Sequence, residues 1–143
     1  MKITLLGDDA IRLQASPGML TIEAASADID YSPFHMLASS LATCTLSVLQ
    51  SWATHAKVRA DDLALEVQWR FADDPHRVSN MAVLLDWQSL PAERLATAQR
   101  VAALCTVHAT LTHPPLIDIL SAADVDGEHH HADEPATSAP ASQ

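Results

Sequence analysis

The sequence of 143 residues is poor in aromatic side chains, glycine, cysteine and basic residues. With only three Trp, two Phe and one Tyr, aliphatic side chains and alanine must fill most of any core. The three glycines are too few for a phosphate-binding glycine loop or a dinucleotide fingerprint. Eight Lys and Arg against 18 Asp and Glu give a net charge of −10, which opposes binding to nucleic acid or to anionic lipids. We therefore predict no nucleic acid and no membrane as partners.

The chain also lacks an apolar run of membrane-spanning length, and its opening, MKITLLGDDAIRLQ, lacks a secretory cleavage site. These absences predict a cytoplasmic protein, where two cysteines are more often free or redox-active than a permanent disulfide. Residues 121–143 contain no Leu, Ile or aromatic side chain, so they cannot bury enough apolar surface to order themselves. We predict one folded domain over residues 1–120 and a disordered acidic tail over 121–143.

Alternating apolar residues and turn-forming clusters predict several strands. Three short strands are expected near the N-terminus, separated by GDD and SPG, at residues 3–6, 11–15 and 20–24. Residues 63–71 alternate cleanly, and residues 78–87 alternate again after the turn ADDPHR, which predicts a long hairpin. The segment LIDIL, residues 116–120, predicts a last strand.

A long helix is predicted over residues 32–53. Ser32 is a good N-cap, and Pro33 suits the first helical position, where its missing N–H costs nothing. Spacings of 4, 3, 4 and 4 place five residues on one apolar face, namely Leu37, Leu41, Cys44, Val48 and Trp52. Cys44 is expected at the centre of that face.

A second helix is predicted from Pro91 to Leu111. Its buried stripe has mostly small residues, which would let another helix approach closely, and consists of Leu95, Ala98, Ala102, Cys105 and Ala109. The order of elements is typical of an α+β fold, with two buried helices packed on antiparallel sheet. Each helix carries one cysteine in its buried stripe. Free cysteine is among the most buried residue types, so both could also be plain core residues.

The two cysteine segments resemble those of a known family. The stretch SPFHMLASSLATCTLSVLQSWA resembles the central helix of the OsmC/Ohr family, and AERLATAQRVAALCTVHATL resembles its second-cysteine helix. The likeness extends over about residues 1–120 and implies an intertwined homodimer with active sites between the subunits. It also implies a thiol peroxidase that reduces small organic hydroperoxides and is recycled by an external thiol reductant.

By this resemblance Cys44 is the peroxidatic thiol and Cys105 the resolving thiol. A thiolate that attacks a peroxide becomes a sulfenic acid, and a second thiol condenses with it to a disulfide. Cys44 lies 11 positions after Pro33, roughly 16 Å along the helix, which is beyond the reach of the helix dipole. Burial would raise its pKa, so a cation is expected from elsewhere.

The family supplies an Arg from the N-terminal strands, steadied by a Glu just after the helix-opening Pro. Arg12 is the only Arg in those strands here, and it could instead be a solvated outward charge. Phe34 and His35 occupy the positions of the Glu, so no carboxylate is present. We assign both to the substrate side of the site; a His in a first helical turn is also common at a surface.

No cofactor and no metal are predicted. Cys105 and His108 could form half of a zinc site, but the sequence offers no second pair at suitable spacing. The run HHH at 129–131 belongs to the predicted tail. The alternative to a peroxidase is a non-catalytic OsmC-like binding or structural dimer whose cysteines are core residues.

Overall fold

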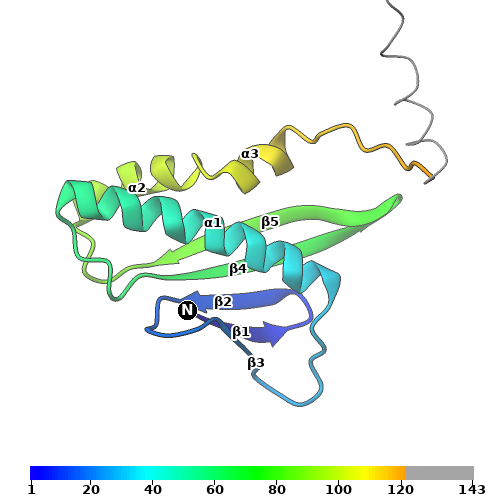
Figure 1. Ribbon diagram of the computed structural model, residues 1–143, viewed down its shortest axis with the longest axis horizontal. Coiled ribbons are helices and arrows are strands. Elements are labelled where there is room, and N and C mark those ends of the chain that lie inside the picture. Colours follow the sequence, from blue (N-terminus) through cyan, green and yellow to red (C-terminus); the bar gives the residue numbers. More distant parts are fainter. Residues whose placement is uncertain (122–143) are drawn as a thin grey trace, which may run out of the picture.

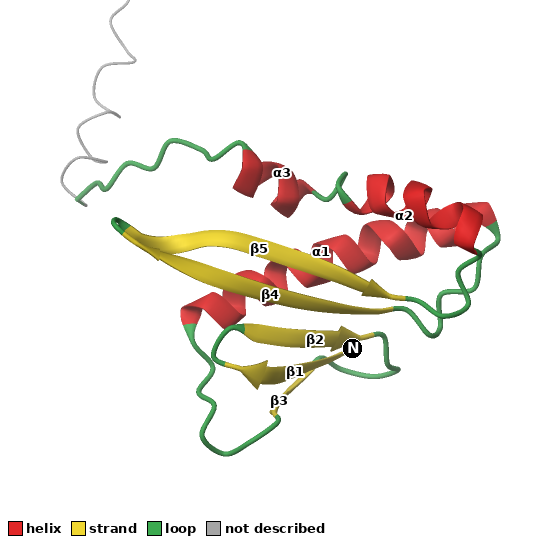
Figure 2. Ribbon diagram, turned by 180° about the vertical axis from the view of Figure 1, so that it is seen from behind, coloured by secondary structure: helices red, strands yellow, loops and turns green. Residues whose placement is uncertain are grey.

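The computed structural model describes residues 1–121, so the predicted tail lies outside the described residues except for Ser121. Five strands form one sheet in the order β3-β1-β2-β4-β5. Helix α1 crosses one face of this sheet, and two shorter helices, α2 and α3, follow one another along α1 (Figures 1 and 2). The predicted α+β class is confirmed, with one sheet in place of several.

The three N-terminal strands form where the alternation predicts them, at β1 (Lys2–Gly7), β2 (Ala10–Gln14) and β3 (Thr21–Ala24). β1 and β2 pair antiparallel, but β3 pairs parallel to β1, which corrects the expectation of a purely antiparallel sheet. The physical reason is that β4 already occupies the free edge of β2. The chain therefore returns through Gly18, at φ 101°, to the far edge of β1.

The predicted hairpin is present as β4 (Ala64–Asp73) and β5 (His76–Asp86), paired antiparallel. Alternation gives its sheet two distinct faces. The inner face is fully buried against α1 and includes Ile11, Leu13, Leu65 and Val67. The outer face carries the residues between them, such as Arg12, Glu66 and Gln68.

Helix α1 spans Pro33–Ala56, with Ser32 as N-cap and Pro33 in the first turn, as predicted. It ends at Lys57, which adopts the left-handed conformation (φ 54°). The stripe that faces the sheet is rich in small residues and includes Ala38, Ala42, Thr45, Leu49 and Ala53. Alanine lets the helix axis come close to the sheet, and the larger side chains of Leu41 and Leu46 are buried beside this stripe.

The strand predicted at residues 116–120 does not form in the single chain. Residues 114–121 have no regular structure and lead away from α3 (Figure 1). Leu116 and Ile119 are each 97% exposed. An isolated apolar segment forms a strand only if a sheet edge is available to pair with it, and this segment pairs with neither β3 nor β5.

Candidate functional site

Cys44 lies in the middle of α1, at the margin of its buried stripe and not at the centre as predicted. It is half-buried because the alanine-rich stripe turns toward the sheet and leaves Cys44 facing the flank of the helix. There it borders an open, mostly apolar pocket of about 450 Å³ between α1, the edge of the sheet and Val107. The other lining residues are Ile3, Leu20, Ile22, Tyr31, Met36, Ser39, Ser40 and Thr43.

Cys105 lies at a break in the second helical segment, which corrects the prediction of one continuous helix. A 3-10 turn (Ala92–Arg94) leads into α2 (Leu95–Ala102), and α3 (Thr106–Thr112) starts anew. Cys105 adopts an extended conformation (φ −60°, ψ 129°), which ends the helical hydrogen bonding. It becomes the N-cap of α3, where its Sγ accepts the His108 N–H at 3.4 Å.

The two thiols meet at this break. Burial raises the pKa of Cys44, and the hydrogen bond that its S–H donates to Cys105 raises that pKa further. Burial also acts to raise the pKa of Cys105, but hydrogen bonds from Cys44, His108, Thr45 and Val107 outweigh it and hold the pKa below the ordinary thiol value. The pair can therefore lose one proton more easily than an isolated buried thiol; among the causes that lower the Cys105 pKa, the interaction with Cys44 is the largest and the His108 N–H at the start of α3 follows it.

Arg12 does not reach the thiols within one chain. Ile11 and Leu13, its neighbours on β2, are fully buried against α1, so Arg12 projects from the opposite face of the sheet. There its guanidinium forms an ion pair with Asp86 at the end of β5. In the single chain, backbone N–H groups of Val107 and Thr106 act to lower the Cys44 pKa, but burial and the interaction with Cys105 outweigh them and the pKa is raised.

His35 has a structural role, which corrects its placement on the substrate side. It is 1% exposed, its Nε2 donates to the Gly7 carbonyl at 2.7 Å, and its Nδ1 accepts the Ser32 N–H at 3.1 Å. Together Ser32 and His35 form a reciprocal capping box, with histidine where glutamate is usual. The ring packs edge-on to Trp69, with centroids 5.2 Å apart. His35 therefore fixes the start of α1 to the β1–β2 turn.

Phe34 is also away from the thiol pocket. Its ring packs edge-on against Phe71, at 4.7 Å between centroids, and Phe71 in turn stacks on His76 at the hairpin tip. Phe34 does not line the pocket beside Cys44. Successive residues on a helix point about 100° apart, so Phe34 and Met36, which does line the pocket, face different ways.

The sequence reasoning missed the groups that surround Cys105, which are Thr45 and the first N–H groups of α3. The even stripe of Ala98, Ala102, Cys105 and Ala109 concealed the break, since it continues at helical spacing.

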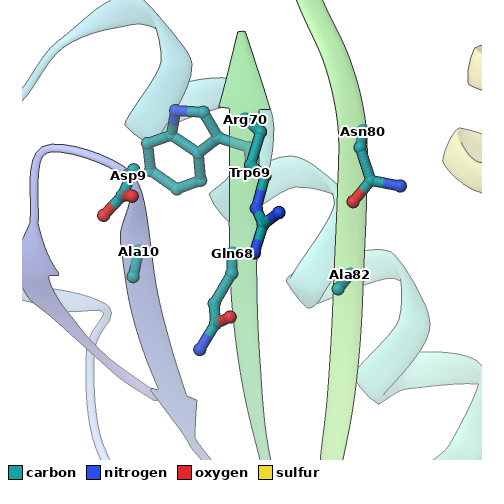
Figure 3. A pocket seen from close by; sticks show the side chains of 7 residues that line it. All are labelled: Asp9, Ala10, Gln68, Trp69, Arg70, Asn80 and Ala82. Atoms are coloured by element: carbon teal, nitrogen blue, oxygen red, sulfur yellow. The ribbon is translucent and has the colours of Figure 1, made fainter.

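A second hollow, of about 310 Å³, lies on the outer face of the sheet (Figure 3). Its polar rim comes from Asp9, Gln68, Arg70 and Asn80, over a floor that includes Ala10 and Ala82. It lies on the face opposite α1 and so takes no part in the thiol site.

Within residues 1–121, no group of three or more His, Cys, Asp or Glu side chains is arranged to hold a metal ion. No helix in this part of the chain is long and apolar enough to cross a membrane. The histidines at 129–131 lie outside the described residues.

Comparisons with known proteins agree with the fold. The model of the family described as OsmC-like protein matches residues 25–119. A crystal structure from Psychrobacter arcticus 273-4, named an osmotic stress induced and detoxification response protein, matches with a TM-score of 0.53 and 21% sequence identity. That match covers 76% of this chain and 84% of the other, and at this identity it supports the fold alone. No curated protein matches the chain.

Proposed function

Because the chain belongs to the OsmC-like family, we propose that it reduces small organic hydroperoxides with Cys44 and Cys105 as its redox pair. The observation that carries the proposal is a pair of free thiols that lie close enough to shift each other's pKa, one of which, Cys44, borders an open apolar pocket. None of the described residues that line this pocket carries a formal charge. An uncharged peroxide with an apolar organic group fits such a lining better than a charged substrate.

Cys44 is the attacking sulfur in this proposal because it borders the pocket, whereas Cys105 is fully buried. The Cys44 sulfur attacks the terminal peroxide oxygen, the O–O bond breaks, and the organic oxygen leaves as an alcohol after taking up a proton. Cys44 is then a sulfenic acid. Cys105 attacks the Cys44 sulfur, the S–O bond breaks, and a disulfide and water result. A thiol reductant must then reduce this disulfide to complete a cycle.

We further propose that the working unit is a homodimer. A single chain leaves large apolar side chains in water, among them Leu104, Leu116, Ile117 and Ile119. Exposed apolar surface of this kind is typical of a protein interface. Sedimentation at micromolar concentration tests the dimer, and a monomer would contradict it.

We also propose a reducing compartment such as the cytoplasm, because two free thiols fit such a compartment.

The peroxidase proposal is tested by intact-mass measurement of the reduced protein after one equivalent of cumene hydroperoxide. We expect a loss of two mass units, equal to the two hydrogens lost in forming the disulfide. The Cys44→Ser variant is the control and should keep its mass. An unchanged mass in the wild-type protein would support the alternative, a non-catalytic OsmC-like domain with cysteines in its core.

A further inference from the structure

Ser39 on α1 has a buried hydroxyl without a partner. The residue is 8% exposed, and within the described chain its Oγ makes no hydrogen bond. Hydroxyls on helices commonly bond back to the carbonyl four residues earlier, as those of Ser47, Thr54 and Thr110 do here at 2.9 Å each. A buried hydroxyl that lacks a partner destabilises a fold, and a ligand that supplies the partner removes this penalty.

Ser39 also lines the pocket that Cys44 borders. It lies five residues before Cys44, which places it roughly 7.5 Å nearer the start of the helix. The same five residues turn the helix by about 140°, so the two side chains lie at different parts of the pocket wall. Ser39 is on the side of the sheet, where Ile3 and Ile22 also line the pocket. A molecule that touches both Ser39 and Cys44 must therefore extend along the pocket.

We infer that Ser39 binds an uncharged oxygen group on the organic part of the hydroperoxide, at the end remote from the peroxide. The preferred substrate is then a hydroperoxide that carries a second oxygen, as an alcohol or a ketone. This inference rests on the proposed peroxidase function. A serine hydroxyl both donates and accepts hydrogen bonds, so it suits either group. None of the described lining residues carries a formal charge, which disfavours a carboxylate or an ammonium group at this place.

Ser39 is a specificity residue in this assignment. It selects among peroxides through their organic part, while the reacting oxygen atoms lie at Cys44. A site that bonds to a hydroxyl rejects the analogue that lacks it, because its own polar group is then left unpaired. Removing the Ser39 hydroxyl should therefore change the preference between two peroxides and leave the reaction of a simple peroxide intact.

Two para-substituted forms of cumene hydroperoxide test the preference. One carries an isopropyl group, and the other carries a hydroxyisopropyl group of nearly the same shape. We expect kcat/KM of the wild-type protein to be about two- to tenfold higher for the hydroxyl-bearing peroxide, the effect of one neutral hydrogen bond. A mostly apolar pocket without such a bond would favour the isopropyl compound. Equal values, or a preference for the isopropyl compound, overturn the inference.

Ser39→Ala should abolish this preference and leave kcat/KM for the isopropyl compound within about twofold of wild type. Ser40→Ala, at the next residue and an exposed position of the same pocket, is the matched control and should keep the preference. The inference is wrong if Ser39→Ala keeps the preference or if both variants lose it equally.

Stability gives a second measurement on Ser39→Ala. We expect its urea midpoint to equal or exceed that of wild type, because the change removes a buried hydroxyl that has no partner in the fold. A clearly lower midpoint would show that the hydroxyl is bonded within the protein, which removes the basis of the inference.

Failure of this inference differs from failure of the proposed function. The para diol, in which a hydroxyl replaces the peroxide, and its isopropyl analogue are compared as protectants of Cys44 against alkylation. If the diol protects better in wild type but not in Ser39→Ala, and peroxide leaves the mass unchanged, the Ser39 assignment holds and the peroxidase proposal is wrong. If peroxide forms the disulfide but both alcohols protect equally, the peroxidase proposal holds and the Ser39 assignment is wrong.

Discussion

Cys44 lies in the middle of a 24-residue helix, whereas Cys105 lies at the start of a helix of seven residues. In the middle of α1 every backbone N–H is already bonded within the helix, so the backbone N–H groups that act on Cys44 come from Thr106 and Val107 of α3, and burial outweighs them. At the start of α3 the first N–H groups are free to bond to sulfur. The two cysteines therefore differ in pKa: that of Cys44 is raised, and that of Cys105 is lowered.

The largest expected effect separates the two thiols by their reactions with peroxide. Cys44→Ser should lower the rate of cumene hydroperoxide consumption by at least about a hundredfold, because the pocket-facing sulfur is gone. Cys105→Ser should still react with the first equivalent and then gain the mass of sulfinic acid at Cys44, because no thiol traps the sulfenic acid. Peroxide assays and peptide mass mapping measure both. If both variants lose the same share of peroxide consumption and Cys44 is not oxidised in Cys105→Ser, the two thiols do not have the separate roles proposed here.

The next effect concerns how α1 begins. His35→Ala should lower the free energy of unfolding by about 2–4 kcal/mol, because it leaves a cavity and an unpaired Ser32 N–H and Gly7 carbonyl. His55→Ala, on the exposed side of the same helix, is the matched control and should change it by about 0.5 kcal/mol or less. Urea denaturation measures both. Comparable losses would mean that the cap built by His35 is not what holds the start of α1.

A smaller effect is the pH dependence of stability. Because the folded-state pKa of Cys105 is lowered, its contribution to stability is fully present above the unfolded value of about 8.5 and is lost as the pH falls through the folded pKa. The pKa of Cys44 is raised, so its contribution is present below about 8.5 and is lost as the pH rises through the folded pKa.

Reduced wild-type protein should therefore gain stability from this pair up to about pH 8.5 and lose it above. Cys105→Ala should remove the gain below about pH 8.5, and Cys44→Ala should remove the loss above it. Denaturation midpoints measured from pH 6 to 10 give the answer. If the stability of Cys105→Ala still rises toward pH 8.5, the lowered pKa belongs to a group other than Cys105.

The smallest effect is expected from Arg12→Ala. The Arg12–Asp86 pair lies partly in solvent on the outer face of the sheet, and such pairs contribute about 0–1 kcal/mol. Because this face is opposite α1, alkylation of Cys44 at pH 6 should change less than twofold. Lys2→Ala, which breaks the comparably exposed Lys2–Glu23 pair on the same sheet, is the control. A much larger fall in Arg12→Ala alone would show that Arg12 reaches the thiols across a subunit interface.

Helices and strands that are specified by nearby residues could be predicted from the sequence. The capped start of α1 follows from Ser32 and Pro33, and the hairpin follows from strict alternation over residues 63–71. The parallel β3 and the break before α3 were not, since each depends on where another element already lies. His35 illustrates the same limit: its position suggested the substrate side of the site, or else the surface, but the Gly7 carbonyl that binds it comes from 28 residues earlier.

The sequence by itself determined the α+β class, the two cysteine segments and the acidic, phosphate-repelling character of the chain, because periodicity, capping and charge act over short distances. Only the tertiary structure decided which groups surround each thiol. The start of α3 exists because the chain turns at Cys105, and Thr45 reaches that sulfur only because α1 and α3 pack together. The pKa of a thiol follows from the donors around it, and these donors come from segments about 60 residues apart in the chain.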